Sequence, residues 1–133
     1  MTVNRTVPRP KPERVTGIAH LFAAAGYSVS GAVRLWQETA FRHIIIGFPI
    51  CVALLGIAGA SFVEFSILAI MFLMLIAVEA LNTAIECIVD HLAPNWEEFA
   101  RDAKDLGSLA TMCLLIAIGV YLSVFVLRCF ALI

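Results

Sequence analysis

Three long apolar stretches constrain this chain more than any other feature of its sequence. Residues 44–63 and 106–127 contain no charged side chain, and a third stretch begins at residue 65 and stays apolar, past two glutamates, to residue 89. Each is close to the ~20 residues that a helix needs to cross a ~30 Å hydrocarbon core. None lies at the N-terminus, where a secretory signal would be. We therefore expect an all-α membrane protein with spans at about 44–63, 65–89 and 106–128.

Composition agrees with this expectation. Hydrophobic residues make up 62% of the 133 residues, and the mean hydropathy is +0.97. A soluble domain of this size cannot bury so much apolar surface, whereas lipid can cover it. The nine Lys and Arg nearly balance the ten Asp and Glu, so net charge indicates no nucleic-acid partner.

The segment before the first span divides into two parts. Residues 1–15 carry basic residues and alternating prolines, which predict a flexible, extended tail ahead of a single membrane domain over residues 16–133. From about residue 16 to 43, apolar residues recur at steps of three and four, opposite a polar face. That pattern predicts an amphipathic helix along the membrane surface, with Trp36 in the headgroup layer. Gly26 and Gly31 favour a break within it.

The distribution of basic residues predicts the orientation. Six of the nine precede the first span, and Arg101 and Lys104 lie between the second and third spans. The connection between the first two spans, near residues 61–64, has none. The positive-inside rule therefore places the N-terminus and the loop over residues 90–105 in the cytoplasm.

One face of the second span carries the chemistry. Glu79, Asn82, Glu86 and Asp90 follow one another at steps of three, four and four, and so share a narrow face of a helix. Each ionisable group inside a span costs at least ~2.5 kcal/mol near the bilayer centre and usually marks a functional site. Their expected depth runs from the inner layer to the cytoplasmic interface. That arrangement suits chemistry between a water-soluble cosubstrate and a lipid headgroup.

A second polar face opens the third span, with Arg101, Lys104, Asp105 and Ser108 at helical steps. Lys104 offers a compact positive charge for a phosphate, and the carboxylates of the second span suit Mg²⁺. These groups are sufficient for phosphoryl transfer, although the sequence has neither a P-loop nor a Gly-rich kinase loop. Taken alone, the cluster of Arg101, Lys104 and Asp105 is more typical of a solvated helix start than of a binding site.

The sequence resembles the prokaryotic diacylglycerol kinase family. Residues 79–90 match its pattern E-x-x-N-[ST]-A-I-E-x-x-x-D, and residues 103–108 match its A-K-D-x-G-S element. Residues 24–28 and 36–42 are similar to parts of its surface helix. The resemblance extends from about residue 17 to the end and includes the three spans.

This resemblance implies a function and an assembly. The family's activity is ATP- and Mg²⁺-dependent phosphorylation of diacylglycerol to phosphatidic acid, a step of phospholipid metabolism, at the cytoplasmic face of the bacterial inner membrane. It also implies a multi-pass homotrimer in membrane lipid, with sites shared between neighbouring subunits.

The resemblance also implies roles for individual residues. Glu79 is expected to be the catalytic base, and Glu38 and Glu86 to be metal ligands. Four residues are expected to contact ATP or its phosphates, namely Asn82, Lys104, Asp105 and Tyr27. Asp90 and Ser108 are expected to contact substrate or to support the structure.

Two other functions fit parts of the same pattern. A branch of the family phosphorylates undecaprenol, another lipid alcohol, and shares the N-[ST]-A-I-E core; the residues 104–108 favour the diacylglycerol branch. A non-catalytic membrane subunit would instead use the glutamates as polar contacts between helices. That alternative predicts no nucleotide binding and tolerance of Glu→Gln changes, and the clustering of polar residues on one side argues against it.

Overall fold

Four α-helices account for nearly all of the residues that the structure describes. The computed structural model describes residues 16–130, so the tail predicted for residues 1–15 lies outside the described residues. The helices are α1 (Ile18–Leu35), α2 (Thr39–Ile57), α3 (Phe62–Leu92) and α4 (Glu98–Cys129).

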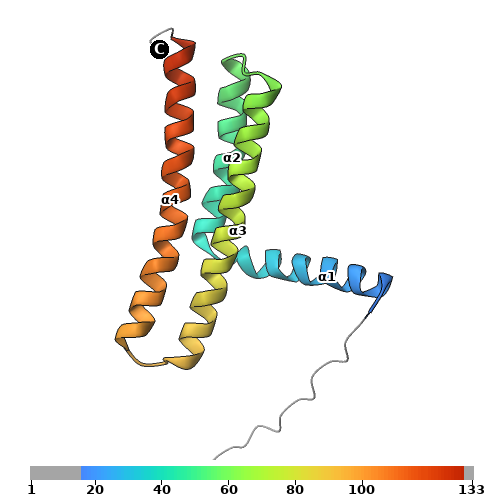
Figure 1. Cartoon of the computed structure of the whole chain (residues 1–133), viewed down its shortest axis with the longest axis vertical. Helices are drawn as coiled ribbons and strands as arrows, with labels where there is room; N and C mark the ends of the chain where they lie inside the picture. The colour runs from blue at the N-terminus through green and yellow to red at the C-terminus, as the bar shows by residue number, and fades with distance from the viewer. Residues whose placement is uncertain (1–15, 131–133) are drawn as a thin grey trace, which may run out of the picture.

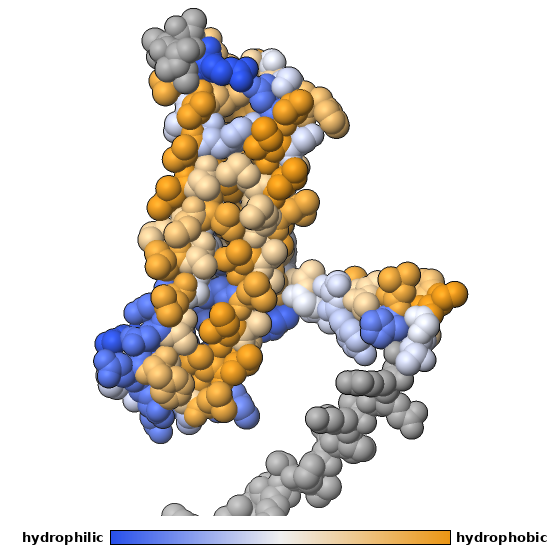
Figure 2. Space-filling model, viewed as in Figure 1, coloured by the Kyte–Doolittle hydropathy of each residue, from blue (hydrophilic) through white to orange (hydrophobic). Residues whose placement is uncertain are grey.

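The last three helices form a bundle, and α1 projects sideways from it (Figure 1). By length and composition α2, α3 and α4 can each cross a membrane, which confirms the three predicted spans. At ~1.5 Å per residue, α3 and α4 are each more than ~45 Å long and exceed a ~30 Å hydrocarbon core. Both continue past the level of α1 (Figure 1). Figure 2 shows apolar residues over the middle of the bundle and polar residues gathered at its two ends.

The surface helix is present but ends earlier than predicted. α1 stops at Leu35 rather than at about residue 43, and Glu38 is extended before α2 begins at Thr39. Leu35 and Phe41 are both buried on either side of this turn, and the Trp36 ring packs edge-on against Phe41. The chain must turn here because α1 lies across the bundle while α2 runs along it. Gly26 and Gly31 do not break α1, contrary to expectation.

The ends of the spans also differ from their predicted positions. α2 ends at Ile57 rather than near residue 63, and α3 begins three residues before the predicted residue 65. Gly59, with φ 75°, makes the tight connection between them in a conformation that favours glycine. Apolar side chains from all three helices pack along the bundle axis, namely Ile44, Leu55, Leu68, Phe72, Leu75, Ile118 and Phe125.

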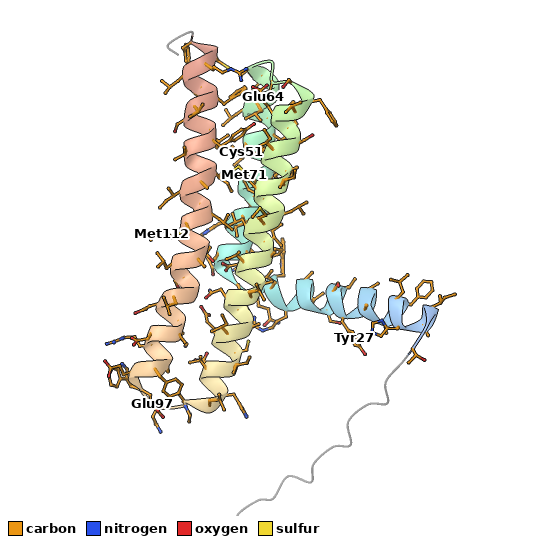
Figure 3. All side chains as sticks on the ribbon, in the orientation of Figure 1. Tyr27, Cys51, Glu64, Met71, Glu97 and Met112 are labelled. Carbon is orange, nitrogen blue, oxygen red and sulfur yellow. The ribbon has the colours of Figure 1, made fainter. Side chains whose placement is uncertain are left out.

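A polar cluster joins α3 to α4 at the end of the bundle far from α1, where Figure 3 labels Glu64. Ser61 and Glu64 form a capping box that starts α3, with the Ser61 backbone N–H donating to Glu64 Oε2 at 2.6 Å. From α4, the Tyr121 hydroxyl donates to the Glu64 carbonyl oxygen at 2.7 Å. The Arg128 guanidinium lies 2.9 Å from Glu64 Oε1. These contacts fix the two helices against each other at this end.

Replacing Tyr121 with Phe is expected to destabilise the bundle. The change removes only the hydroxyl that donates to the Glu64 carbonyl, and a side-chain hydrogen bond of this kind contributes about 0.5–1.5 kcal/mol. The free energy of unfolding, measured by denaturant titration in detergent micelles, should fall by that amount. Tyr27→Phe is the matched control, because Tyr27 is 70% exposed on α1. Equal stability of the two variants would contradict the prediction.

Candidate active site

A polar cleft of about 300 Å³ opens between α3 and α4, beside the start of α2. It contains five of the residues singled out in the sequence: Glu38, Glu79, Asn82, Glu86 and Ser108. Thr83, Thr111, Met112, Leu115 and Ala40 complete its lining. The helical spacing of the acidic face on α3 therefore brings three of its four members into one cavity.

The deepest acidic group in the cleft is Glu79. Its side chain is only 4% exposed, and Oε2 accepts a hydrogen bond from the hydroxyl of Thr111 on α4 at 3.1 Å. Thr111 is itself buried. A carboxylate at such a position is costly without a partner. The bond to α4 supplies one partner and leaves the second carboxylate oxygen available to the cleft.

Asn82 links the cleft to the packing of the two helices. Its Nδ2 donates to Glu86 Oε1 at 2.9 Å, one turn along α3. Its buried Oδ1 accepts no hydrogen bond from the described residues and faces Gly107 on α4. A Cβ added at Gly107 would overlap that oxygen. The glycine of the A-K-D-x-G-S element therefore allows α4 to approach the amide of Asn82.

Glu38 reaches the cleft from the turn before α2, and Arg34 holds it there. Arg34 Nη1 lies 2.6 Å from Glu38 Oε1, and Nη2 donates to the sulfur of Cys87 on α3 at 3.5 Å. The pKa of Arg34 is raised, because its guanidinium donates to the Glu38 carboxylate and to Cys87. Since Cys87 follows Glu86 directly, the surface helix meets α3 at the level of Glu86. Glu79 lies seven residues deeper, or ~10 Å.

The structure separates the remaining predicted residues from this cleft. Asp90, Lys104 and Asp105 line a second cavity of about 280 Å³ near the α3–α4 connection, the end at which Figure 3 labels Glu97. There Lys104 forms an ion pair with Asp90. Arg101 pairs with Asp102 and lies 6.0 Å from the centre of the Trp96 ring. Within a single chain, Lys104, which the sequence predicts to bind phosphate, is therefore paired with Asp90 of α3.

Tyr27 is the predicted site residue that lies farthest from both cavities. It is on α1, out along the helix from the bundle (Figure 3), and lines neither cavity. The described residues also contain no group of three or more His, Cys, Asp or Glu side chains close enough to hold a metal ion. Glu38 and Glu86 do line the same cleft, so they can supply two oxygen ligands.

Sequence reasoning did not single out Thr111, Thr83 or Arg34 as site residues. Thr111 could have been found, because it lies three residues after Ser108 and extends the polar face of α4 by one turn. Its hydrogen bond to Glu79 could not have been found, because the two residues are far apart in the sequence and meet only when α3 packs against α4. Arg34 has an ordinary position on the polar side of an amphipathic helix, and its two partners are supplied by the turn at Glu38 and by the packing of α1 against α3.

An apolar groove adjoins the polar cleft. It has a volume of about 350 Å³ and shares Ala40, Thr111 and Leu115 with the cleft. The rest of its lining is almost entirely apolar: His43, Ile44, Gly47, Cys51, Phe72, Leu75 and Ile118. Carboxylates that can accept a proton or bind a cation thus lie beside a surface suited to hydrocarbon. The arrangement can act on a molecule with a polar head and an apolar tail.

Known proteins resemble the chain over most of its length. The family model for prokaryotic diacylglycerol kinase matches residues 26–126. A diacylglycerol kinase from Sinorhizobium sp. is 52% identical over 109 residues, which cover 82% of this chain and 80% of that protein. The diacylglycerol kinase of Helicobacter pylori strain 26695 is 33% identical over 76% of this chain and 80% of its own length. That of Escherichia coli K12 is 31% identical over 76% of this chain and 84% of its own.

Gly107→Ala is expected to destabilise the chain and displace Asn82. The added methyl group would overlap Asn82 Oδ1, and overpacking of this kind costs about 1–3 kcal/mol. Gly119→Ala is the matched control on the same helix, because a Cβ there meets no atom within 4 Å. Thermal unfolding in micelles should distinguish the two variants. If Gly107→Ala unfolds at the same temperature as Gly119→Ala, the close approach of α4 to Asn82 is not required.

Proposed function

This chain belongs to the prokaryotic diacylglycerol kinase family, and from that membership we propose that it transfers the γ-phosphoryl group of ATP to the hydroxyl of diacylglycerol. The product is phosphatidic acid. The observation that carries the proposal is the buried carboxylate of Glu79, bonded to a threonine that lines both the polar cleft and the apolar groove. A lipid alcohol has its reacting hydroxyl at the same kind of boundary.

Glu79 is proposed to act as the general base. Its free carboxylate oxygen takes the proton of the lipid hydroxyl while the hydroxyl oxygen bonds to the γ-phosphorus. The bond from that phosphorus to the oxygen bridging the β- and γ-phosphates breaks, and ADP leaves. Phosphoryl transfer depends mainly on positioning and on charge stabilisation, so few protein groups are needed. The burial of Glu79 supports this role, because a base that is shielded from water takes a proton from the bound substrate rather than from solvent.

The phosphates of ATP are proposed to lie between the two cavities. Asn82 faces the first cavity, and Lys104, in the second, would exchange its ion pair with Asp90 for a phosphate. Glu38 and Glu86 would bind Mg²⁺, which commonly takes one or two protein carboxylates and completes its shell with phosphate oxygens and water. When bound, Mg²⁺ neutralises charge on the phosphates. Asp105 and Tyr27 are proposed as further nucleotide contacts, and Asp90 and Ser108 as supporting residues.

Diacylglycerol is favoured over undecaprenol as the substrate. The relatives from Sinorhizobium, Helicobacter and Escherichia are all named diacylglycerol kinases. The groove beside the cleft supports the choice of a lipid, since its walls suit acyl chains. A non-catalytic subunit is disfavoured, because Glu38 and Glu86 line the cavity beside Glu79, and the contact between α3 and α4 at Thr111 needs neither of them.

The protein is proposed to be a homotrimer in the bacterial inner membrane with its cleft on the cytoplasmic side. Within one chain, Lys104 lines a different cavity from Glu79, and Tyr27 lines neither cavity. This separation supports a site that is completed by a neighbouring subunit. The orientation follows from the basic residues. Arg34, Arg42, Arg101 and Lys104 lie on the side of the cleft, whereas Arg128 is alone at the far end of α4.

Glu79→Gln is expected to slow phosphoryl transfer strongly without removing it entirely. The substitution keeps the size of the side chain and removes the base, which should lower kcat by a factor on the order of 10²–10⁴. Transfer of label from [γ-³²P]ATP to diacylglycerol, and separately to undecaprenol, would be measured in mixed micelles with Mg²⁺. The control is Glu98→Gln, whose side chain is 76% exposed at the start of α4. Full activity of Glu79→Gln would remove the proposed base, and a preference for undecaprenol would change the substrate.

Glu86→Gln is expected to raise the Mg²⁺ concentration that gives half-maximal activity. Loss of one of two proposed protein ligands weakens the metal site, and a change to a group that only supports a metal ligand already costs about 10–100-fold in affinity or activity. Mg²⁺ titrations at saturating ATP would measure the shift in the variant and in Glu98→Gln. Identical titration curves would exclude Glu86 as a ligand. Direct Mn²⁺ binding, followed by electron paramagnetic resonance, gives a readout that does not depend on turnover.

A further inference from the structure

The hydroxyl of Thr111 has no role in the mechanism proposed above, although it donates a hydrogen bond to the proposed base, Glu79. This is the bond that ties the carboxylate of α3 to α4, and it engages Oε2 alone. Among the described residues no other side chain donates to Glu79, so Oε1 is left for the cleft. Both side chains are less than 9% exposed, and water competes little for the bond.

The electrostatics of the cleft give this hydroxyl added importance. Glu38 and Glu86 line the same cavity as Glu79, and none of the described residues that line it is basic. The cleft thus contains three carboxylates; among the described residues Arg34 pairs with Glu38, but no basic side chain forms an ion pair with Glu79 or Glu86. A long glutamate side chain in such surroundings has several rotamers available to it. A fixed donor on the opposite helix selects one of them.

We infer that Thr111 is the positioning residue for the catalytic base: its hydroxyl holds Glu79 Oε2 against α4 and thereby directs Oε1 at the lipid hydroxyl. The inference rests on the proposed function of Glu79. Thr111 lies at the junction of the polar cleft and the apolar groove, where the reacting hydroxyl of a lipid with its tail in the groove would lie. The base is thus oriented at the boundary between headgroup and acyl chain.

Threonine suits this position better than other small residues. Its branched carbon restricts χ1, and its methyl group can face the apolar groove while its hydroxyl faces the carboxylate. Elsewhere in the chain, Ser28, Ser30 and Ser123 use their hydroxyls to donate to a backbone carbonyl four residues earlier in their own helix. Thr111 instead donates to another helix. Ser108, one turn away and exposed, makes no such bond in the described structure.

The test compares Thr111→Val, which keeps the shape and removes the donor, with Thr111→Ser, which keeps the donor. In Thr111→Val, kcat should fall by about 10- to 100-fold, as expected when a reacting group is misplaced by about 1 Å. KM for ATP and for diacylglycerol should stay within about twofold, because neither substrate is bound by this hydroxyl. Thr111→Ser should restore most of kcat. Ser123→Ala is the control, since it removes a hydroxyl from the same helix that bonds only to backbone.

A double variant separates positioning from packing. Thr111→Val should have no further effect on kcat in a Glu79→Gln background, because the carboxylate that it orients is gone. An added loss in the double variant, or failure of Thr111→Ser to restore activity, would assign Thr111 to packing and overturn the inference. Full activity of a folded Thr111→Val enzyme would also overturn it while leaving an inactive Glu79→Gln, and hence the proposed base, intact. Full activity of Glu79→Gln would instead remove the proposed base, whereas no transfer to either lipid by the folded, unsubstituted protein would overturn the proposed function itself.

Discussion

The close packing of α3 against α4 is the contact on which the rest of the structure depends. Gly107 allows α4 to approach Asn82, and one turn further along α4 the Thr111 hydroxyl meets Glu79. At the far end, Tyr121 and Arg128 of α4 hold Glu64 of α3. Lipid offers no hydrogen bonds, so a buried carboxylate in a span must find its partners on another helix. The two helices are therefore joined by polar contacts at both ends, with apolar side chains between them.

The site lies where two environments meet. Glu79 is almost fully buried, whereas Asp90, about three turns further along α3, has a side chain that is 64% exposed and paired with Lys104. Soluble kinases enclose their phosphates with a glycine-rich loop, for which this sequence has no counterpart. Here the helices themselves present an apolar groove, a polar cleft and a cavity lined by both acidic and basic side chains. In the proposed function, the groove would hold the acyl chains of a lipid alcohol, the cleft would hold its hydroxyl, and the phosphates of the nucleotide would lie between the cleft and the second cavity.

The surface helix contributes more than attachment to the membrane. Through Arg34 it contacts both Glu38 and Cys87, so its position along α3 is tied to the turn that carries a proposed metal ligand. Its apolar side and its polar side are separate in Figure 2, as expected for a helix in the interface. The same helix, predicted to lie along the membrane surface, thus helps to hold an acidic side chain in the lining of the cleft.

The sequence by itself determined the number of spans, the surface helix and the acidic face of α3, because each depends on periodicity and length within one segment. It also marked Glu79, Asn82 and Glu86 as members of one site. It did not reveal the turn at residues 36–38, since no glycine or proline interrupts the helical pattern there and the direction of the chain is set by the bundle. Nor did it pair Thr111 with Glu79, Arg34 with Glu38, or Lys104 with Asp90. Pairs that join different elements depend on how helices pack and rotate against each other, which only the tertiary structure decided.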